Sequence, residues 1–546
     1  MRPTSTTTRL IAASGAALAA VALAACGPAT KNAADSGPLT GGTLIYGHEQ
    51  EPPCLIGGWV QEAYIDRQFL DSLVSQVDDG KIVPWLATSW SVSADQLTWT
   101  FKLKPGVKFT DGTPLDAAAV STNFEYWLDP KGGNSTVQSY IGEYYDSSRA
   151  VDATTLELKL KKPYSPLLSA LSQGYFGILS PKGLERGAEA NCETPIGSGP
   201  FKIEKWHRGQ DITFVKNPAY NSAPANAKHQ GPAYLDKIVW KFLKNPTVRY
   251  GALTTGQAQV IYDVPTVNWQ DAKARFTVQQ YITPGRPVTL SLNTTKFPTD
   301  DVKVRQALAW GLDRKAAVES AFNNAIPYNG NPALSQSTPD YDASLADAYT
   351  HDPAKANALL DQAGWTRRNA AGFRTKNGKQ LDIKLVYPAG PVFTQEGATL
   401  LQNLQQQVKE VGINIDLIPA NESETFSGKY SGPDAYNGIT WYWTSPTAGV
   451  LYIVWRQTLK DRPNYNNSSF YNNPELETTI GQANSTLDES EQKALYAKAQ
   501  KIVSDNAAAI GLYTQTTSLA WGKDVQGVWI EDSQGEPVFH DAYLAK

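Results

Sequence analysis

The segment WYWTSP, residues 441–446, carries three consecutive aromatic side chains that could hold a ligand. If it is extended, Trp441 and Trp443 share one face and Tyr442 lies on the other. Flat aromatic faces suit sugar rings, aromatic side chains and apolar groups, and the polar edges of Tyr and Trp can form hydrogen bonds. The three rings therefore either line a binding cleft or fill a hydrophobic core. Arg456, further along, could pair with a ligand carboxylate or form a surface ion pair.

Sequence signatures of enzymes are missing. The sequence has no GxSxG, no HExxH and no glycine-rich dinucleotide fingerprint in a strand–helix setting. No two histidines are three or four residues apart, and they are scattered along the chain: His48, His207, His229, His351 and His540. No CxxC motif or Cys/His zinc spacing occurs either. We therefore expect no catalytic site, no metal site and no bound cofactor.

Composition sets the class of protein. The chain has 546 residues, of which 41% are hydrophobic and 19% charged, as in ordinary globular proteins. This length predicts about three domains. The net charge of −4 leaves no basic stripe to neutralise phosphates, so we expect no nucleic-acid partner.

The N-terminus is typical of an export signal. Arg2 and Arg9 precede an apolar, alanine-rich run over residues 10–25, which is too short for a transmembrane span. It ends in LAAC, which resembles the bacterial lipoprotein processing box and implies that the mature chain begins at a lipidated Cys26. Ordinary secretion with a chance cysteine is the alternative. Residues 26–42 are small and polar and are predicted to be a flexible tether.

Two further cysteines, Cys54 and Cys192, belong to the exported part of the chain. Such a compartment permits disulfides, so we expect a bridge between them. Two buried free thiols are the alternative.

Local patterns predict an α/β architecture. A helix is expected over 352–364, with Asp at its N-cap, Pro in its first turn and Gly at its end. Residues 381–387 and 413–418 alternate as strands do, and an apolar helical stripe over 401–411 lies between them. Strand, helix, strand suggests a βαβ unit in a partly parallel sheet. WYWTSP follows just beyond another predicted strand.

Four motifs occur in a fixed order along the chain. They are PWLATSWSVSADQLTWTFKLKPGVKFTDGTPLDAAAV (84–120), PIGSGPF (195–201), DVKVRQALAWGLDRKAAV (301–318) and ALLDQAGW (358–365). The set closely resembles the family 5 solute-binding proteins of ABC importers, which include oligopeptide, dipeptide, nickel and some oligosaccharide binders. Aromatic residues of the first motif are interpreted as packing the sheet of the second lobe: Trp90, Trp99, Phe101 and Phe109.

The resemblance implies a two-lobed, periplasmic-binding-protein-like clamp of class II type, with an inserted extra subdomain. Two strands crossing between the lobes would act as the hinge, and solute would favour the closed state by contacting both lobes. The closed form would dock on a membrane permease whose ATPase subunit drives import. We expect a monomer divided as follows: lobe I, residues 43–80, 196–285 and 515–546; inserted subdomain, 81–195; lobe II, 286–514.

The resemblance also locates the ligand site, with one departure. Family peptide binders carry Trp-x-x-Asp-x-x-Asp-Pro where this chain has WYWTSP, and a carboxylate there can pair with a peptide ammonium. Here Thr444 and Ser445 stand where an acid would be expected. This weakens the usual amine anchor and favours ligands that present rings, held by Trp441, Tyr442 and Trp443.

The region 48–59 borders the ligand in the family and forms the other expected wall of the cleft. Glu51, or its neighbour Glu49, could replace the missing anionic anchor, and Trp59 is a further candidate. Tyr262 and Asp263 are weaker candidates near the hinge side.

These observations predict an extracytoplasmic solute-binding lipoprotein, anchored to the cell membrane through Cys26, that captures an oligopeptide for an ABC permease. An oligosaccharide or glycosylated small molecule is the alternative solute, favoured by the aromatic segment. A receptor that uses the same clamp without transport, and an exported hydrolase, are the remaining alternatives.

Overall fold

The computed structural model describes residues 38–55, 64–131, 135–390 and 393–545. The expected signal segment, Cys26 and Trp59 lie outside the described residues. Within the described ranges, no helix combines the length and the apolar character that crossing a membrane requires.

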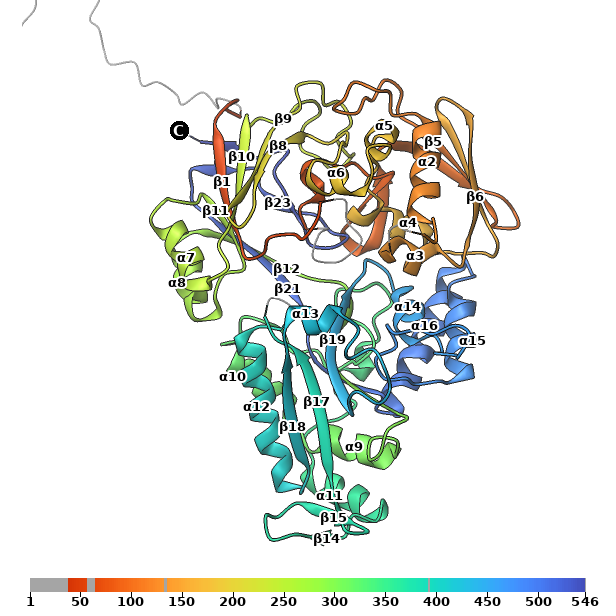
Figure 1. Cartoon of the computed structure of the whole chain (residues 1–546), viewed down its shortest axis with the longest axis vertical. Helices are drawn as coiled ribbons and strands as arrows, with labels where there is room; N and C mark the ends of the chain where they lie inside the picture. The colour runs from red at the N-terminus through yellow and green to blue at the C-terminus, as the bar shows by residue number, and fades with distance from the viewer. Residues whose placement is uncertain (1–37, 56–63, 132–134, 391–392, 546) are drawn as a thin grey trace, which may run out of the picture. The chain divides into compact units, whose positions relative to one another are not determined.

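The first large sheet belongs to lobe I, and among the described residues it has seven strands (Figure 1). In order across the sheet they are β12 (Thr277–Ile282), β21 (Thr516–Trp521), β11 (Val260–Tyr262), β1 (Thr43–His48), β10 (Lys237–Phe242), β9 (Asp211–Lys216) and β8 (Phe201–His207). Side chains alternate along β1, so that Leu44 and Tyr46 pack into one core. Ile45 packs on the opposite face, against the cluster that contains α7 (Pro246–Thr254) and α8 (Trp269–Arg275) residues.

A second sheet lies in the inserted subdomain. Its described strands follow the order β4 (Ala87–Val92), β5 (Thr98–Leu103), β7 (Thr155–Leu160) and β6 (Tyr145–Asp152). Its helices are α2 (Ala117–Trp127), α3 (Ser135–Ile141), α4 (Leu167–Leu171), α5 (Pro181–Leu184) and α6 (Ala188–Glu193). Trp99 and Phe101 are buried on β5, with Phe109 in the same core and Trp90 packed against it. The expectation that these four aromatic residues pack the second lobe's sheet is wrong, because their strands pair only within this subdomain's sheet.

Lobe II contains the third large sheet. Described strands run in the order β18 (Asn414–Ala420), β17 (Asp382–Pro388), β19 (Gly438–Thr444), β13 (Gly285–Leu292) and β20 (Ala509–Tyr513). Helices associated with it are α9 (Val302–Trp310), α10 (Arg314–Ala321), α11 (Pro353–Gln362), α12 (Gln395–Glu410) and α13 (Glu422–Phe426). β17 and β18 pair in parallel on either side of α12 in the chain, which confirms the predicted βαβ unit.

Local signals set the helix ends in this lobe. Asp352 accepts a hydrogen bond from the Lys355 N–H at 2.9 Å and caps α11, as predicted. Gly412 follows α12 with φ of +87°, a left-handed conformation that suits glycine and ends the helix.

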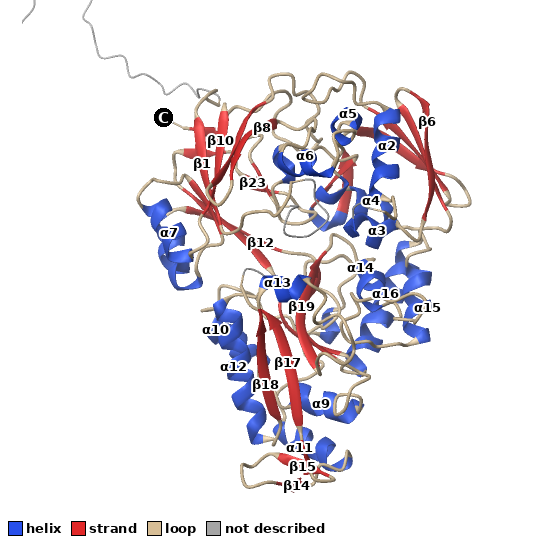
Figure 2. Ribbon diagram, in the orientation of Figure 1, coloured by secondary structure: helices blue, strands red, loops and turns tan. Residues whose placement is uncertain are grey.

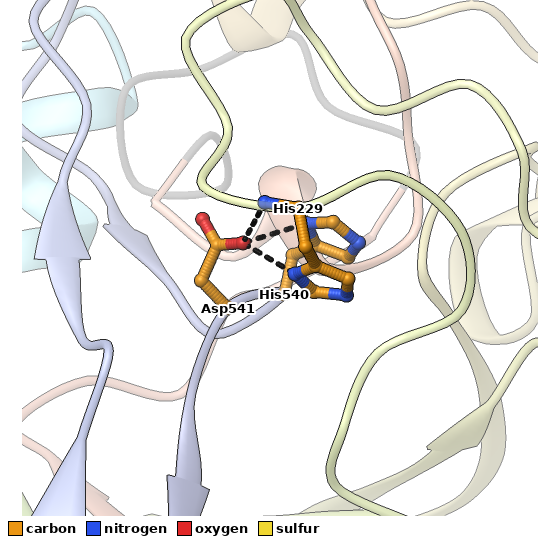
Figure 3. A group of neighbouring side chains, drawn as sticks. All are labelled: His229, His540 and Asp541. Carbon is orange, nitrogen blue, oxygen red and sulfur yellow. Dashed lines mark hydrogen bonds and ion pairs between the residues drawn. The ribbon is translucent and has the colours of Figure 1, made fainter. Parts of the chain in front are cut away.

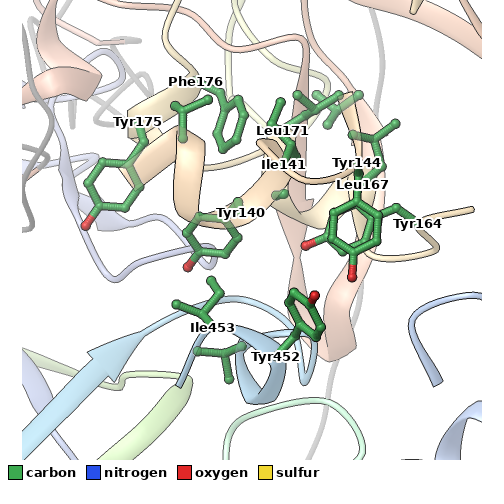
Figure 4. Packing of buried hydrophobic residues seen from close by; sticks show 14 of the residues in the cluster. Tyr140, Ile141, Tyr144, Tyr164, Leu167, Leu171, Tyr175, Phe176, Tyr452 and Ile453 are labelled. Atoms are coloured by element: carbon green, nitrogen blue, oxygen red, sulfur yellow. The ribbon is translucent and has the colours of Figure 1, made fainter. Parts of the chain in front are cut away.

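Three helices of lobe II, α14 (Val450–Trp455), α15 (Pro474–Ala483) and α16 (Glu489–Asp505), share one hydrophobic cluster with the inserted subdomain. Figure 4 shows the junction, where Tyr140 and Tyr144 face Tyr452 and Ile453. Tyr452 donates a hydrogen bond to Glu143 at 2.6 Å across it. The inserted subdomain therefore contacts lobe II through buried side chains as well as surface ones.

Two short connections join the sheets of the two lobes. β12 ends at Ile282 and β13 begins at Gly285, while β20 ends at Tyr513 and β21 begins at Thr516. Figure 2 shows β12 running from the sheet of lobe I toward α13 and β19. The lobe boundaries expected at 285/286 and 514/515 stay predictions, and the first of them lies just inside β13. Gly285 has φ of +118°, and a Cβ there would lie 2.0 Å from the Trp443 carbonyl oxygen. Only glycine lets β13 approach β19 this closely.

The smaller elements complete the description. Short ladders are formed by β2 (Val74–Val77) with β3 (Lys81–Pro84), β14 (Arg367–Arg368) with β15 (Arg374–Lys376) and β16 (Lys379–Gln380), β22 (Val525–Gln526) with β25 (Tyr543–Leu544), and β23 (Trp529–Ile530) with β24 (Pro537–Val538). Single 3-10 turns are η1 (Asp66–Gln68), η2 (Asp78–Gly80), η3 (Gly174–Phe176), η4 (Thr266–Asn268) and η5 (Ala343–Leu345). Cys54 and Cys192 form a disulfide, with their Cα atoms 4.6 Å apart, that ties the segment after β1 to α6.

Candidate functional site

A cavity of about 400 Å³ lies between lobe II and the inserted subdomain. This is within the size range of small-molecule binding sites. Its walls come from β19, the ends of β17 and β18, the loops after α13 and α14, and α3 and η3 of the inserted subdomain. Aromatic side chains dominate the lining: Tyr175, Tyr430, Tyr436, Trp441, Tyr442, Trp443 and Tyr465.

The WYWTSP segment forms one wall of this cavity. Residues 441–444 belong to β19 itself, which corrects the expectation that they follow a strand, because β19 pairs with β13 as far as Thr444. Trp443 packs against the cluster shared with the inserted subdomain, and Tyr442 packs against the core of lobe II. The segment therefore both lines a cavity and packs against two hydrophobic cores. From the sequence alone, lining a cleft and filling a core were alternative interpretations.

Tyr140 of the inserted subdomain holds this strand. Its hydroxyl accepts a hydrogen bond from Trp443 Nε1–H and donates one to the Thr444 carbonyl oxygen, each at 3.2 Å. Burial raises the pKa of Tyr140 to about 12, so the hydroxyl keeps its proton at physiological pH. The sequence offered no signal for this contact, since Tyr140 lies about three hundred residues from its partners.

A second cavity, of about 90 Å³, is bounded by lobe I and lobe II. Tyr442 and Thr444 line both cavities, so the two spaces meet at β19. From lobe I the lining includes His48, Glu49 and Tyr262. Tyr262, an expected site residue, lies on the last position of β11, with its ring centroid 4.5 Å from that of His48.

Glu49 and Asp263 share one buried guanidinium. Arg249 Nη2 lies 3.6 Å from a Glu49 carboxylate oxygen and 3.1 Å from an Asp263 carboxylate oxygen. The Arg249 side chain is only 1% exposed, and it also donates to the carbonyl oxygens of Leu243 and Tyr262. Asp263 adopts φ of +52°, which turns its backbone sharply after β11.

This arrangement leaves negative charge in excess. Burial raises the pKa of Glu49 to about 8; the neighbouring Asp263 carboxylate adds to the rise, and Arg249 opposes it. Burial also raises the pKa of Asp263. Glu396, in the first turn of α12 in the opposite lobe, adds to the rise for both acids. A cation placed beside Glu49 would relieve the shortage of positive charge.

Two expected site residues are engaged elsewhere. Glu51 accepts hydrogen bonds from Trp206 Nε1–H at 3.1 Å and from the Gly209 N–H at 2.9 Å, on the β8–β9 hairpin, and lines neither cavity. Arg456 forms an ion pair with Glu143 of the inserted subdomain, with an N–O distance of 3.4 Å. Of the two glutamates weighed from the sequence, Glu49 is the one that faces the cavity.

Arg286 is a candidate that sequence reasoning missed. It lies opposite Trp443 in the β13–β19 pairing, so its side chain emerges on the face of the sheet that carries Trp443. Within the described residues, its buried Nε and Nη2 have no hydrogen-bond partner. Burial lowers the pKa of the guanidinium to about 10. Arg286 itself lines neither cavity, but Trp443 beside it lines the larger one, and a guanidinium with unpaired nitrogens suits the carboxylate of a ligand.

Two sheets joined by two short connections, with a cavity bounded by both, define the class of protein as a two-lobed solute-binding clamp. Residues 81–474 match the family model described as "Bacterial extracellular solute-binding proteins, family 5 Middle". The chain belongs to this family, whose members are extracytoplasmic solute-binding proteins of ABC importers and which is a family of transport proteins rather than enzymes.

Two curated relatives are similar to this chain over most of its length, and a solved structure shares its fold. The chain is 28% identical over 445 residues to the nickel-binding periplasmic protein of Escherichia coli K12, covering 80% of this chain and 81% of that protein. It is 28% identical over 489 residues to the glutathione-binding protein GsiB of Escherichia coli O1:K1 / APEC, covering 88% and 90%. The oligopeptide-binding protein AppA of Bacillus subtilis, in complex with a nonapeptide, shares the fold with a TM-score of 0.77 and 22% identity, over 93% of this chain and all of AppA.

Proposed function

We propose that the protein captures an oligopeptide with a free amino end and delivers it to an ABC permease. The observation that carries this proposal is the Glu49–Arg249–Asp263 group, in which two carboxylates share one guanidinium at an inter-lobe cavity. The α-ammonium of a peptide supplies the missing positive charge, and its hydrogen bonds to a carboxylate would be charge-assisted.

The remaining lining fits the rest of a peptide. Aromatic rings of the larger cavity offer apolar surface with polar edges for side chains. Arg286 is the proposed partner of a ligand carboxylate. Relatives named for peptide solutes, such as the nonapeptide complex of AppA, support this solute class.

A second candidate solute is an oligosaccharide or a glycosylated small molecule. The observation in its favour is the density of tyrosine and tryptophan around the 400 Å³ cavity, since sugar rings stack on such faces. Under this proposal the acids beside Arg249 would not contact the ligand.

The rest of the proposal concerns delivery. The protein works as a monomer, held at the outer face of the cell membrane by lipid on Cys26, and releases its solute unchanged. Solute would favour closure because it contacts both lobes at once. A deletion strain that loses solute uptake would separate an importer from a receptor.

A binding screen tests the solute class. The purified protein is titrated calorimetrically with peptides that have free or acetylated N-termini, free or amidated C-termini, and with oligosaccharides. We expect free-amine peptides to bind and acetylation to weaken binding strongly; saccharide binding without peptide binding would establish the second candidate. Mass spectrometry of the recovered ligand checks that it is unchanged, because cleavage would point to a hydrolase.

A further inference from the structure

Three side chains meet in lobe I, away from both cavities of the clamp. His229 comes from the loop between β9 and β10, and His540 and Asp541 follow β24 near the C-terminus. The two imidazole rings stack, with centroids 4.1 Å apart and planes 10° from parallel. Asp541 Oδ1 lies 2.6 Å from His229 Nδ1 and 3.5 Å from His540 Nδ1 (Figure 3). The scattered histidines of the sequence thus include two that the fold brings together.

Backbone carbonyls determine which nitrogen of each ring carries the proton. His229 Nε2 lies 3.0 Å from the Pro232 carbonyl oxygen, and His540 Nε2 lies 2.8 Å from that of Gly231. A carbonyl oxygen can only accept, so each Nε2 must donate. In a neutral imidazole this leaves Nδ1 as a lone pair. Both Nδ1 atoms then face the same carboxylate oxygen, and neither ring offers that oxygen a proton.

Among the described residues, the Nδ1 atom of His540 is left without a hydrogen-bond donor. Its side chain is 4% exposed, and its Nδ1 is buried without a hydrogen-bond partner in the described part of the chain. A proton on His229 alone would join that ring to Asp541 but leave His540 Nδ1 without a partner. Protonating both rings would put two positive charges into stacked rings. A single divalent cation satisfies both lone pairs and the carboxylate at once.

Asp541 is oriented in the way that metal-binding carboxylates usually are. Its Oδ2 accepts from Trp529 Nε1–H at 3.0 Å and from the Lys228 N–H at 3.1 Å, which directs Oδ1 toward the two rings. Its Oδ1 also accepts from the His229 N–H at 3.2 Å. Hydrogen bonds from each imidazole to a carbonyl, and from neighbouring groups to the carboxylate, are the outer-shell pattern of zinc sites.

We propose that His229, His540 and Asp541 bind a zinc ion that fastens the C-terminal segment to the loop before β10. Two imidazole nitrogens and one carboxylate oxygen are a donor set that suits Zn²⁺, with water in the fourth position. Ligand atoms of a tetrahedral zinc lie about 3.3 Å apart, and the three donor atoms lie within 4.8 Å of one another. Binding would require the two stacked rings to rotate until both lone pairs point at the ion, and Asp541 Oδ1 to move away from His229 Nδ1. His229, with a side chain 15% exposed, gives the ion access.

The site is independent of the proposed solute, because none of its three residues lines either cavity of the clamp. Its test starts from the full chain stripped with EDTA and dialysed against one equivalent of Zn²⁺. We expect one zinc per chain by elemental analysis, a rise in Tm of about 2–4 °C, and visible absorption bands typical of a four-coordinate site when Co²⁺ replaces Zn²⁺.

Variants assign the ion to these residues. His229→Gln and Asp541→Asn should each lose the bound zinc and the Tm rise. His207→Gln is the matched control, because His207 also faces a carboxylate, Asp211 at 2.9 Å, but has an exposed side chain and belongs to no metal-binding group in the described part of the chain. This variant should behave as the wild type. His229→Gln avoids the fully buried ring, and circular dichroism confirms that it is folded.

Two results would overturn the proposal. One is a wild-type chain that holds no stoichiometric zinc and shows no cobalt bands. The other is unchanged zinc binding in folded His229→Gln, which would place the ion elsewhere, including in the clamp. In either case the three side chains would be a hydrogen-bonded clip in which a proton joins His229 to Asp541.

Discussion

At the scale of single residues, the site is defined by an imbalance of charge. Arg249 is shared by two carboxylates and four backbone carbonyl oxygens, so neither Glu49 nor Asp263 has a positive charge to itself. Transferring a charged group from water into the protein costs free energy unless the group is paired. This cost raises the pKa of the Glu49 carboxyl to about 8. A residue in this condition is prepared to bind a cation.

The first prediction concerns Glu49→Gln. The variant keeps the shape of the side chain but loses the charge that would pair with a ligand ammonium, so affinity for a free-amine peptide should fall by about 10- to 100-fold. Glu51→Gln is the matched control, because Glu51 bonds to Trp206 and Gly209 away from the cavities. Isothermal titration measures both, and equal losses in the two variants would contradict the assignment of Glu49.

The second prediction concerns the pH dependence of stability. Glu49 has a folded-state pKa of about 8, above its ordinary value of 4.5, so the folded chain holds an extra proton between these values. Its contribution to stability is therefore present at low pH and lost as pH rises toward and past 8. The Tm of ligand-free Glu49→Gln should gain on the wild type from pH 5 to pH 9. Calorimetry across this range checks it, and a constant difference would count against the raised pKa.

The third prediction separates the aromatic residues. Trp441→Ala should weaken solute binding about 5-fold, because the ring lines the larger cavity. Trp441→Phe, which keeps a flat face, should retain most of the affinity. Trp443→Ala should lower Tm as well, because Trp443 packs in a core and bonds to Tyr140. Wild-type affinity in folded Trp441→Ala would remove this ring from the site.

At the scale of elements, β19 is the centre of the site because β13 and α3 hold it from two sides. Its aromatic residues reach two cavities only while β13 pairs with it through Thr444. The close approach at Gly285 makes this pairing possible, since no other residue fits between β13 and the Trp443 carbonyl. One backbone position thus controls the wall of the cavity.

The fourth prediction tests that control. Gly285→Ala should destabilise the protein by about 2–4 kcal/mol and weaken solute binding, because the new Cβ would meet the Trp443 carbonyl oxygen at 2.0 Å in a left-handed backbone conformation. Gly251→Ala, in α7 with open space around the added carbon, should leave binding unchanged and stability equal or higher. Urea unfolding measures the two, and a silent Gly285→Ala would refute this account of β13.

At the scale of the whole molecule, solute capture depends on contacts between parts that are distant in the chain. The cavities are bounded by lobe I, lobe II and the inserted subdomain, and the junction around Tyr140, Tyr144 and Tyr452 packs the inserted subdomain against lobe II. A ligand that fills the larger cavity contacts both the inserted subdomain and lobe II. Binding and closure should therefore be coupled.

The fifth prediction removes one of these contacts. Tyr140→Phe loses the hydrogen bonds to Trp443 and Thr444, each of which is worth about 1 kcal/mol, so solute affinity should fall about 5- to 20-fold and tryptophan fluorescence should shift. Tyr126→Phe, on α2 of the same subdomain and away from the cavities, is the control. If Tyr140→Phe binds solute as the wild type does, this junction does not contribute to capture.

The sequence by itself determined what local patterns can encode. Helix caps such as Asp352, the alternation in β17 and β18, and the motifs over residues 84–365 were sufficient for the α/β class and the family, because each depends on neighbours in the chain or on short segments. It also singled out WYWTSP and the acids at 49 and 51 as candidate site residues.

Only the tertiary structure decided which of these residues meet. It brings Glu49 to Arg249 and Asp263, directs Glu51 to the β8–β9 hairpin, places Arg286 beside Trp443, and joins His229 to Asp541, 312 residues further along. Contacts between residues so far apart in the sequence depend on how the strands pair and the helices pack in the folded chain. The spacing of residues in a sequence does not determine the distances that long-range packing sets between them. The balance of charge between the two carboxylates and Arg249 can therefore be assessed only in the folded molecule.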